Sequence, residues 1–441
     1  MLKKLLGGIF WILLANLIVK PLWLLGIEVS VQNTVGNEAY GFYYALFSFS
    51  YIFNILLDLG LTNFNTRNMA QHPQLISKHL SGILGIKICL LGVYVAVTFA
   101  AGFIMGYGCA EFRLLALLTI CQFLNSLILY LRSNLEGLML FKWDSLFSVL
   151  DRILMIIICG MLLWGPRLSI LNIDFTIYHF VFAQLAAYLI TAALAIMVIS
   201  RKTHFRRLRF DWRFFLVILR QSAPFALLVL LMASYNRIDP ILLRLIASDA
   251  DAGIYAGAFR LLDALTMFAY LISVPLLPTY SRLSHDGNNK HIADITRIVF
   301  WPVLILSLAV AIICSLYAEQ LMGFLYHSQA QLYAPIFRTI IFSLVPISIT
   351  YIFGTLLTAG GHMRQLNIFA VTSLALNITI NIILIPRIGA VGSAWASLSA
   401  QSFMAIAQLI LAIKLFHLPA STFRIPSMTT IKALLKEQTT Q

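Results

Sequence analysis

The sequence predicts an all-α, polytopic membrane protein with about twelve transmembrane helices. Of its 441 residues, 60% are hydrophobic and only 11% are charged, whereas a water-soluble domain carries about 25% charged residues. The hydrophobic residues lie in runs of about 20 or more, the length at which one helix crosses the hydrocarbon core of a bilayer. Because these runs lack the alternating pattern of a membrane β-barrel, we expect helices that satisfy their own backbone hydrogen bonds.

Twelve such runs follow one another along the chain. The first begins after Lys3 and Lys4 and imitates a secretory signal, but since no small-x-small cleavage site follows it, we expect it to be the first span. No long polar or low-complexity segment between the runs indicates an extra soluble domain. The runs lie near residues 7–29, 40–63, 82–106, 113–139, 146–165, 174–200, 214–246, 254–280, 297–317, 332–358, 366–386 and 389–416.

The charges of the loops predict which side of the membrane each loop faces. If the N-terminus is cytoplasmic, nineteen loop lysines and arginines lie inside, and only Arg113, Arg167 and Arg387 lie outside. Cytoplasmic loops carry an excess of such residues, and one missed span would scramble the alternation, so we expect an even number of spans with both termini cytoplasmic. This topology accounts for most of the net charge of +14, which therefore does not indicate a nucleic-acid partner.

A short repeated pattern indicates two halves. Gly41 and Gly253 each open the pattern G-x-Y-x3-F, which follows an acidic outer loop in both places and begins the second span of a six-span half. Chance is the competing explanation, since these residue types are common here. Two halves that both begin inside form a parallel repeat, and such repeats place a cleft between two lobes that rock to give alternating access. The matched aromatic residues are Tyr43 with Tyr255 and Phe47 with Phe259.

The expected domain boundaries follow from this repeat. Residues 1–200 are expected to form a six-helix N-terminal lobe and residues 214–416 a six-helix C-terminal lobe. The basic stretch 201–213 is expected to be a cytoplasmic linker, or an interfacial helix that touches anionic headgroups. Residues 417–441 would form a cytoplasmic tail.

Charged residues inside the runs are the candidates for function, because a charge in hydrocarbon is costly and seldom kept without a partner or a task. Of these, Lys87, Arg220 and Arg244 lie near run ends, where we expect them to snorkel to the headgroups. The cations within or beside the runs are Lys20, Lys87, Arg132, Arg152, Arg220, Arg237, Arg244, Arg260 and Arg338. The acids are Asp58, Glu136, Asp151, Asp239 and Asp263.

The placement of these charges predicts two clusters. One lies toward the cytoplasmic side of the first half, and the other toward the outer side of the second half. They are either structural ion pairs that fasten helices or two gates that flank a cleft. Because a guanidinium binds phosphate oxygens bidentately, a free arginine in such a cleft suits an anionic headgroup. The inner cluster is Asp58, Arg132, Glu136, Asp151 and Arg152, and the outer one Arg237, Asp239, Arg260 and Asp263.

Proline is expected to shape the outer cluster. Arg237 and Asp239 are two residues apart and would point to different faces of a straight helix. Pro240 removes a backbone donor, so we expect a kink near Asn236. Either this kink or partners on a neighbouring helix, such as Arg260 and Asp263, would reconcile the two positions.

The chain resembles the Wzx-type flippases of bacterial polysaccharides, which belong to the MOP (MATE-like) superfamily. The resemblance implies a two-lobed bundle with a central cationic cavity that moves an undecaprenyl-pyrophosphate-linked oligosaccharide, such as an O-antigen unit of lipopolysaccharide, across the bacterial inner membrane. By position it also implies roles for Asp58, Arg67, Arg237 and Asp239. The matching stretches are "VGNEAYGFYYALFSFS", "LLDLGLTNFNTRNMA", "YNRIDPILLR", "DAGIYAGAFRLLDAL", "LLPTYSRL" and "NIILIPRIGAVGSAWAS".

The predicted roles divide the candidates into two sets. Arg237, Arg260, Arg132 and Lys20 are expected to contact the anionic headgroup of the substrate. The residues expected to gate or couple transport are Asp58, Arg67, Glu136, Asp151, Arg152, Asp239 and Asp263.

Three alternatives stay open at this point. A MATE-type drug antiporter takes cations and should have a net acidic cavity, and a peptidoglycan-precursor flippase commonly has extra spans. A membrane glycosyltransferase or glycan polymerase needs a carboxylate pair, for which Asp249 and Asp251 are the candidates in a loop too short to build a pocket. Because no Ser-His-Asp, HExxH, Walker A or GxGxxG pattern is found, we expect a protein that is not an enzyme.

Few further partners are indicated. The five cysteines are odd in number and lack a CxxC pattern, so neither a disulfide framework nor a metal or cofactor site is expected. The expected partners are the lipid bilayer and the lipid-linked oligosaccharide, with a glycan polymerase and chain-length proteins as candidates. The driving force is left open among a proton, sodium and the substrate gradient.

Overall fold

The fold is entirely helical in the part of the chain that the structure describes. The computed structural model describes residues 18–62, 65, 76–137, 140–165, 174–201 and 212–423. Within these ranges every regular element is a helix, and 11 helices are long and apolar enough to cross a membrane. The prediction of an all-α, multi-pass membrane protein is confirmed. The cytoplasmic position of both termini stays a prediction.

Among the described residues, the first of the 11 candidate spans is one long helical stretch, Ile18–Leu57. It contains the described part of the first predicted run, residues 18–29, and most of the second, 40–63. This stretch contains the π-helix η1 (Leu22–Glu28), α2 (Val29–Ile52) and the short 3-10 helix η2 (Phe53–Leu57). Its continuity is interrupted at Gly36, where φ is 84° and ψ is 167°. Only glycine adopts that backbone conformation readily, so the residues on either side of Gly36 form two helical segments within this stretch.

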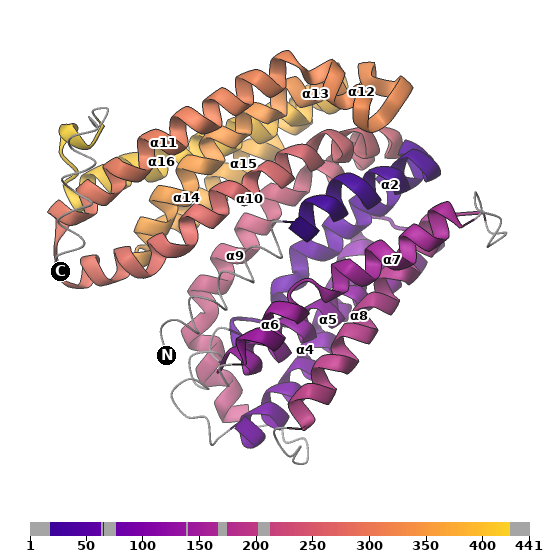
Figure 1. The fold of residues 1–441 in the computed structure, drawn as a ribbon, viewed down its shortest axis with the longest axis horizontal. Coiled ribbons are helices and arrows are strands. Elements are labelled where there is room, and N and C mark those ends of the chain that lie inside the picture. The colour runs from indigo at the N-terminus through magenta and orange to yellow at the C-terminus, as the bar shows by residue number, and fades with distance from the viewer. Residues whose placement is uncertain are drawn as a thin grey trace. The chain divides into compact units, whose positions relative to one another are not determined.

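The contacts divide the chain into two compact units, Met1–Gly253 and Ile254–Gln441. In the first unit, α2 packs on α5, α8 and α9, and α7 packs on α8 (Figure 1). Because α9 packs on α2, it groups with the first unit, whereas the predicted lobe boundary lies before it, at residues 201–213. That boundary stays a prediction. Besides the helices of the stretch Ile18–Leu57, this unit contains α4 (Ile76–Ile104), α5 (Cys109–Gly137), α6 (Phe141–Phe147), α7 (Leu150–Trp164), α8 (Ile177–Ser200) and α9 (Trp212–Ile246).

The second unit is a bundle in which α14 packs on α11 and α16, and α15 packs along α16. The helix α10 (Asp249–His285) begins in the first unit and continues into this one. The other helices are α11 (Asn289–Leu316), α12 (Ala318–Tyr326), α13 (Ala330–Ile340), α14 (Leu344–Ala359), α15 (Met363–Ile388) and α16 (Ala390–Phe416), with the 3-10 helices η4 (His327–Gln329), η5 (Ile341–Ser343) and η6 (Ala420–Phe423).

Apolar side chains lie both on the buried faces of the helices and on their exposed faces. Leu131 and Leu135 of α5 lie in a buried cluster with Ile83 and Ile86 of α4. On other faces, large aliphatic side chains are exposed, such as Leu306 of α11 at 61%. Large exposed apolar surfaces are unusual for a soluble protein and are expected where lipid is the solvent.

The two matched motifs have the same local structure. Tyr43 stacks on Phe47 with ring centroids 5.8 Å apart, and Tyr255 stacks on Phe259 at 5.9 Å. Both tyrosines are buried. The equivalence that the sequence pattern predicts therefore extends to side-chain packing in the two segments.

The glycines of the motifs allow a very close helix crossing. A Cβ added to Gly41 would lie 1.8 Å from the carbonyl oxygen of Asp249, and one added to Gly253 would lie 2.0 Å from that of Asn37. The side chain of Gln32 spans the crossing and donates to the carbonyl of Gly253 at 2.8 Å. The first turn of α10 is thus held against α2 by backbone contact.

We expect Gly41→Ala to destabilise the protein, because the obstructing atom is backbone and cannot turn aside. Overpacking of this kind costs about 1–3 kcal/mol. The thermal stability of the purified protein in detergent measures it. Gly92→Ala is the matched control, since nothing lies within 4 Å of its added Cβ, and it should leave the melting temperature unchanged or raise it. Equal melting temperatures for the two variants would contradict the close crossing.

Candidate functional site

Asp58 is positioned by a turn that ends the first helical stretch. Residues 58–60 form this turn after η2, and Leu59 (φ 45°) and Gly60 (φ 83°) both have left-handed backbones. The Asp58 carboxylate accepts hydrogen bonds from the backbone N–H of Thr62 at 3.3 Å and from its hydroxyl. These bonds fix the carboxylate toward α4.

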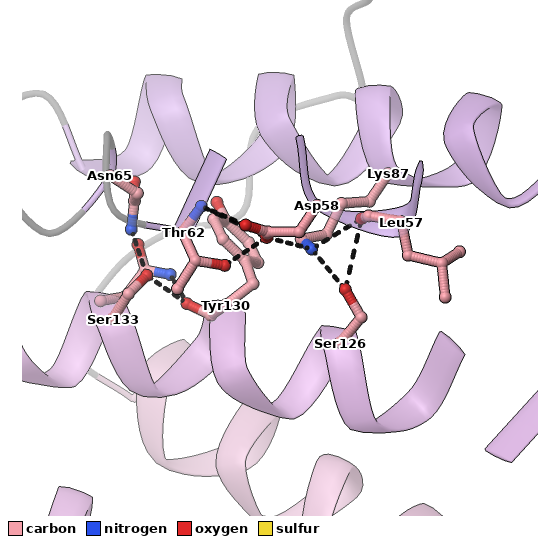
Figure 2. A network of polar contacts seen from close by, with 9 residues as sticks. Leu57, Asp58, Thr62, Asn65, Lys87, Ser126, Tyr130 and Ser133 are labelled. Atoms are coloured by element: carbon pink, nitrogen blue, oxygen red, sulfur yellow. Dashed lines mark hydrogen bonds and ion pairs between the residues drawn. The ribbon is translucent and has the colours of Figure 1, made fainter. Parts of the chain in front are cut away.

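The partner of Asp58 is Lys87 of α4, at 3.0 Å from Nζ to Oδ1 (Figure 2). The lysine ammonium also donates to the carbonyl of Leu57 at 3.1 Å and to Ser126 Oγ at 2.9 Å. It lies over the ring of Tyr130, 5.7 Å from the centroid. An ammonium has three N–H donors, and here each has an acceptor.

The expectation that Lys87 snorkels to the headgroups is wrong. The side chain is 1% exposed. The helix begins at Ile76, several residues before the apolar run at 82–106, so Lys87 lies well inside α4 rather than near its end. Its burial is stabilised by the carboxylate and by the neutral acceptors around it, as a buried charge requires.

The polar network continues along α5. Asn65 donates to Ser133 Oγ at 2.8 Å, and Ser133 in turn donates to the carbonyl of Tyr130 at 2.7 Å (Figure 2). These contacts tie residue 65, just beyond the Asp58 turn, to the same helix that supplies Ser126.

Arg132 of α5 pairs with an acid that sequence reasoning did not select. Its Nε lies 2.7 Å from Oδ1 of Asp144 in α6, and the two side chains are 19% and 1% exposed. Glu136, which belongs to the same predicted cluster as Arg132, is partly exposed on the same helix. Asp144 lies between the predicted runs 113–139 and 146–165, so the hydropathy pattern does not mark it as a charge inside the membrane.

Arg152 of α7 lies in a separate aromatic environment. Its Nε is 3.6 Å from Oδ2 of the adjacent Asp151, and its guanidinium lies 5.7 Å from the ring centroid of Trp23. Trp23 Nε1 donates to Glu28 at 2.9 Å, and Tyr40 donates to the same carboxylate at 3.3 Å. Glu28 is therefore an acid in the first helical stretch that sequence reasoning missed.

Arg237 of α9 contacts α2. It donates to the hydroxyl of Tyr44 at 2.9 Å, and its guanidinium lies 6.0 Å from the ring centroid of Tyr44 and 5.4 Å from that of Tyr51. A phenol and two ring faces attract a cation without neutralising it. Asp239 is fully buried. The α9 helix is assigned without interruption across Pro240, and the kink near Asn236 stays a prediction.

Arg244 does not snorkel as expected but is held at the end of α9 by two acids. Its Nη2 lies 2.7 Å from Glu111, and its Nε lies 2.8 Å from Asp249. The guanidinium also covers the rings of Phe42 and Tyr107, at 4.7 and 5.5 Å from their centroids. Burial raises the pKa of Tyr107 to about 12, and the Arg244 cation opposes this rise. Asp249, a candidate for the rival carboxylate pair, is thus engaged in an ion pair.

In the second unit, Arg260 is buried within α10. It donates to the hydroxyl of Tyr326 at 2.5 Å, and that hydroxyl donates to the carbonyl of Gly257 at 3.2 Å. Asp263 lies one turn further along α10 and is partly exposed. Arg260 therefore contacts α12, a helix that sequence reasoning did not connect with it.

Two predicted residues remain to be placed. Lys20 is partly buried in the first described turn of helix, before η1. Arg67 lies outside the described residues. In the described part of the chain, no three His, Cys, Asp or Glu residues are grouped so that they could hold a metal ion. The two helical units therefore contain lysine and arginine side chains that are held by aromatic rings, hydroxyls and carboxylates.

The fold defines the class of protein. The structure resembles an inward-facing multidrug resistance MATE transporter of the MOP superfamily with a TM-score of 0.71, at 14% identity over 92% of this chain and 98% of that one. It resembles the lipid II flippase MurJ with a TM-score of 0.69, at 15% identity over 100% of this chain and 93% of that one. The chain thus has the fold of MOP-superfamily transporters and flippases.

Sequence comparison then gives the family. The polysaccharide biosynthesis protein family matches residues 5–284, which is more than half of the chain, so this protein belongs to that family. The MatE family matches residues 224–383. An uncharacterized membrane protein of Methanocaldococcus jannaschii is 24% identical over 405 residues, 88% of this chain and 93% of that protein.

Proposed function

We propose that this protein is a flippase that carries undecaprenyl-pyrophosphate-linked oligosaccharide units across the bacterial inner membrane. The observation that carries the proposal is the family match over residues 5–284, on a fold that it shares with a lipid II flippase. Polysaccharide assembly on a lipid carrier requires that a charged, sugar-bearing headgroup cross the hydrocarbon core. A multi-pass protein with internal cations can lower that barrier, because the headgroup is itself costly to place in hydrocarbon.

Arg237 is the residue that we propose to contact the pyrophosphate most directly. Its guanidinium donates to the hydroxyl of Tyr44 and lies over the rings of Tyr44 and Tyr51, and a guanidinium keeps its positive charge in proteins. A guanidinium binds phosphate oxygens bidentately. Arg260, Arg132 and Lys20 are the other proposed headgroup contacts, of which Arg132 is engaged with Asp144 in this structure.

The proposed mechanism is alternating access without covalent chemistry. Ion pairs that hold helices together in one state are the proposed gates, and the pair between Asp58 and Lys87 is the best defined of them. The other proposed gate or coupling residues are Arg67, Glu136, Asp151, Arg152, Asp239 and Asp263. A proton gradient, a sodium gradient and the substrate gradient remain the candidate driving forces, and a glycan polymerase and chain-length proteins remain candidate partners.

A cation antiporter is the second candidate, and it has its own support. The MatE family match over residues 224–383 and the likeness to an inward-facing MATE transporter favour it. A cavity for cationic drugs should be lined by acids. The family match that covers more of the chain is to the polysaccharide biosynthesis family, and it favours the flippase. The cargo therefore decides between the two candidates.

A deletion strain tests the proposed cargo. Loss of the protein should abolish the surface glycan and trap lipid-linked units on the cytoplasmic face, where a membrane-impermeant probe of the sugars reaches them only after the membrane is permeabilised. Plasmid-borne protein should restore both. Normal surface glycan in the deletion strain, together with increased sensitivity to cationic drugs, would instead support the antiporter. Normal translocation with altered glycan length would support a polymerase.

A further inference from the structure

A cavity of the second unit is lined by none of the site residues described above. Its volume is about 400 Å³, and it is lined by residues of the first turns of α11, the end of α16 and the start of η6. Those ends also terminate two candidate membrane spans, Asn289–Leu316 and Ala390–Phe416. The cavity therefore lies where a bilayer would present its phosphate layer.

The walls of the cavity are fixed by specific contacts. His417 ends α16 in the left-handed conformation, with φ 48° and ψ 44°, and this turns the chain back toward α11. Phe423 of η6 then packs on Phe300 and Phe353, with ring centroids 5.7 and 6.5 Å apart. Because these rings hold η6 against the bundle, the cavity is part of the folded unit rather than a gap beside a loose tail.

The charge of the lining suits a single phosphate. Lys290, Asp294 and Arg297 line the cavity from one face of α11, since they are four and three residues apart. Two cations and one carboxylate leave one net positive charge. A phosphodiester carries one negative charge and is balanced by this lining.

A buried hydroxyl without a partner also points to a ligand. Thr422 is 2% exposed, and within the described part of the chain its Oγ1 has no hydrogen-bond partner. The same residue lines the cavity. Buried hydroxyls are normally hydrogen-bonded, and a phosphate oxygen in the cavity would accept from this one.

The rest of α11 provides a surface for acyl chains. Ile305, Leu308 and Ile312 lie on the helix face that begins with Lys290, Asp294 and Arg297. They are 54%, 42% and 44% exposed. One face of α11 therefore passes from a charged end into an exposed aliphatic strip, in the order of a phospholipid's head and tails.

We propose that this cavity binds the phosphodiester headgroup of an anionic phospholipid, with the acyl chains along α11. The predicted topology places Lys290 and Arg297 on the cytoplasmic side, where anionic lipids attract basic residues. The site does not depend on the cargo of the protein, so it stands or falls separately from the proposed function.

The test is lipid binding to the full-length protein in detergent. We expect dioleoylphosphatidylglycerol to raise the melting temperature and to bind in native mass spectra, and dioleoylphosphatidylcholine to do so much less. Inorganic phosphate is the third probe. If it raises the melting temperature as much as phosphatidylglycerol at the same concentration, the ligand is a free anion and the assignment to lipid is wrong.

Variants locate the site. Lys290→Gln with Arg297→Gln should weaken phosphatidylglycerol binding about 30-fold, since each cation near an anionic surface contributes about fivefold. The matched control is Arg282→Gln with Arg364→Gln, which removes two exposed cations of the same unit that do not line the cavity. Equal losses in the two double variants would overturn the proposal.

Thr422→Val separates binding from folding. It removes an unsatisfied hydroxyl, so the lipid-free protein should melt at the same or a higher temperature. Its binding of phosphatidylglycerol should be about fivefold weaker. Unchanged lipid binding in this variant, with a folded protein, would contradict a headgroup in the cavity.

Discussion

Arg237→Gln is expected to lower export of the lipid-linked glycan by about 10- to 100-fold, the loss of a hydrogen bond between charged groups. The guanidinium donates to the hydroxyl of Tyr44 and lies over the rings of Tyr44 and Tyr51. Glutamine keeps a donor for the phenol but removes the charge, so folding should be retained while headgroup binding is lost. The measurement is surface glycan in a deletion strain that carries the variant, normalised to the amount of protein in the membrane.

Two further variants make this result specific. Arg237→Lys keeps the charge but not the bidentate geometry, so it should export at an intermediate level. Arg338→Gln removes an arginine of an exposed pair with Glu319, whose side chains are 48% and 61% exposed, and should leave export unchanged. Wild-type export by Arg237→Gln would exclude Arg237 from the headgroup site. Loss of Arg237→Gln from the membrane would mean that the arginine is structural.

Asp58→Ala is expected to destabilise the first unit by about 3–5 kcal/mol, the cost of leaving a buried charge without its partner. Lys87 is 1% exposed and has Asp58 as its charged partner at 3.0 Å. The neutral acceptors that remain, Ser126 Oγ and the Leu57 carbonyl, do not balance the ammonium. The melting temperature of the purified protein and its yield in the membrane measure the effect.

The double variant Asp58→Asn with Lys87→Met is the control for this pair. It removes both charges and keeps similar side-chain volumes, and replacement of a whole buried pair is often neutral or stabilising. We therefore expect it to recover most of the lost stability, whereas Arg338→Gln at an exposed pair should cost only about 0–1 kcal/mol. If Asp58→Ala is no less stable than Arg338→Gln, the ammonium of Lys87 is not buried as described. If the double variant is stable but does not export, the pair has a role in transport.

The fold class was predictable because composition alone identifies the solvent of the helices. Sixty per cent hydrophobic residues in runs of membrane-spanning length leave few alternatives to a helical membrane bundle. The count of spans was less predictable. The break at Gly36 depends on one backbone conformation, and a hydropathy pattern does not distinguish two helices joined there from two separate spans.

The partners of the charges were the least predictable part. Lys87 was assigned to a helix end because hydropathy marks the apolar run and not the helix, which begins earlier, at Ile76. Asp144 lies between two apolar runs and Glu28 lies at the end of one, so hydropathy does not single out either acid. Sequence spacing finds partners on one helix face, but Arg132 with Asp144 and Asp58 with Lys87 are pairs between helices. A signal for Glu28 was available in Trp23 and Tyr40, whose polar atoms need an acceptor when buried.

Transport by the purified protein in proteoliposomes tests the central claim most directly. Undecaprenyl-pyrophosphate-linked oligosaccharide is incorporated in both leaflets, and a membrane-impermeant glycosidase is added outside. With the protein present, the inner pool should become accessible to the enzyme as well, and with Arg237→Gln it should stay protected. Protection of half of the lipid-linked sugar despite a folded, correctly inserted wild-type protein would contradict the account.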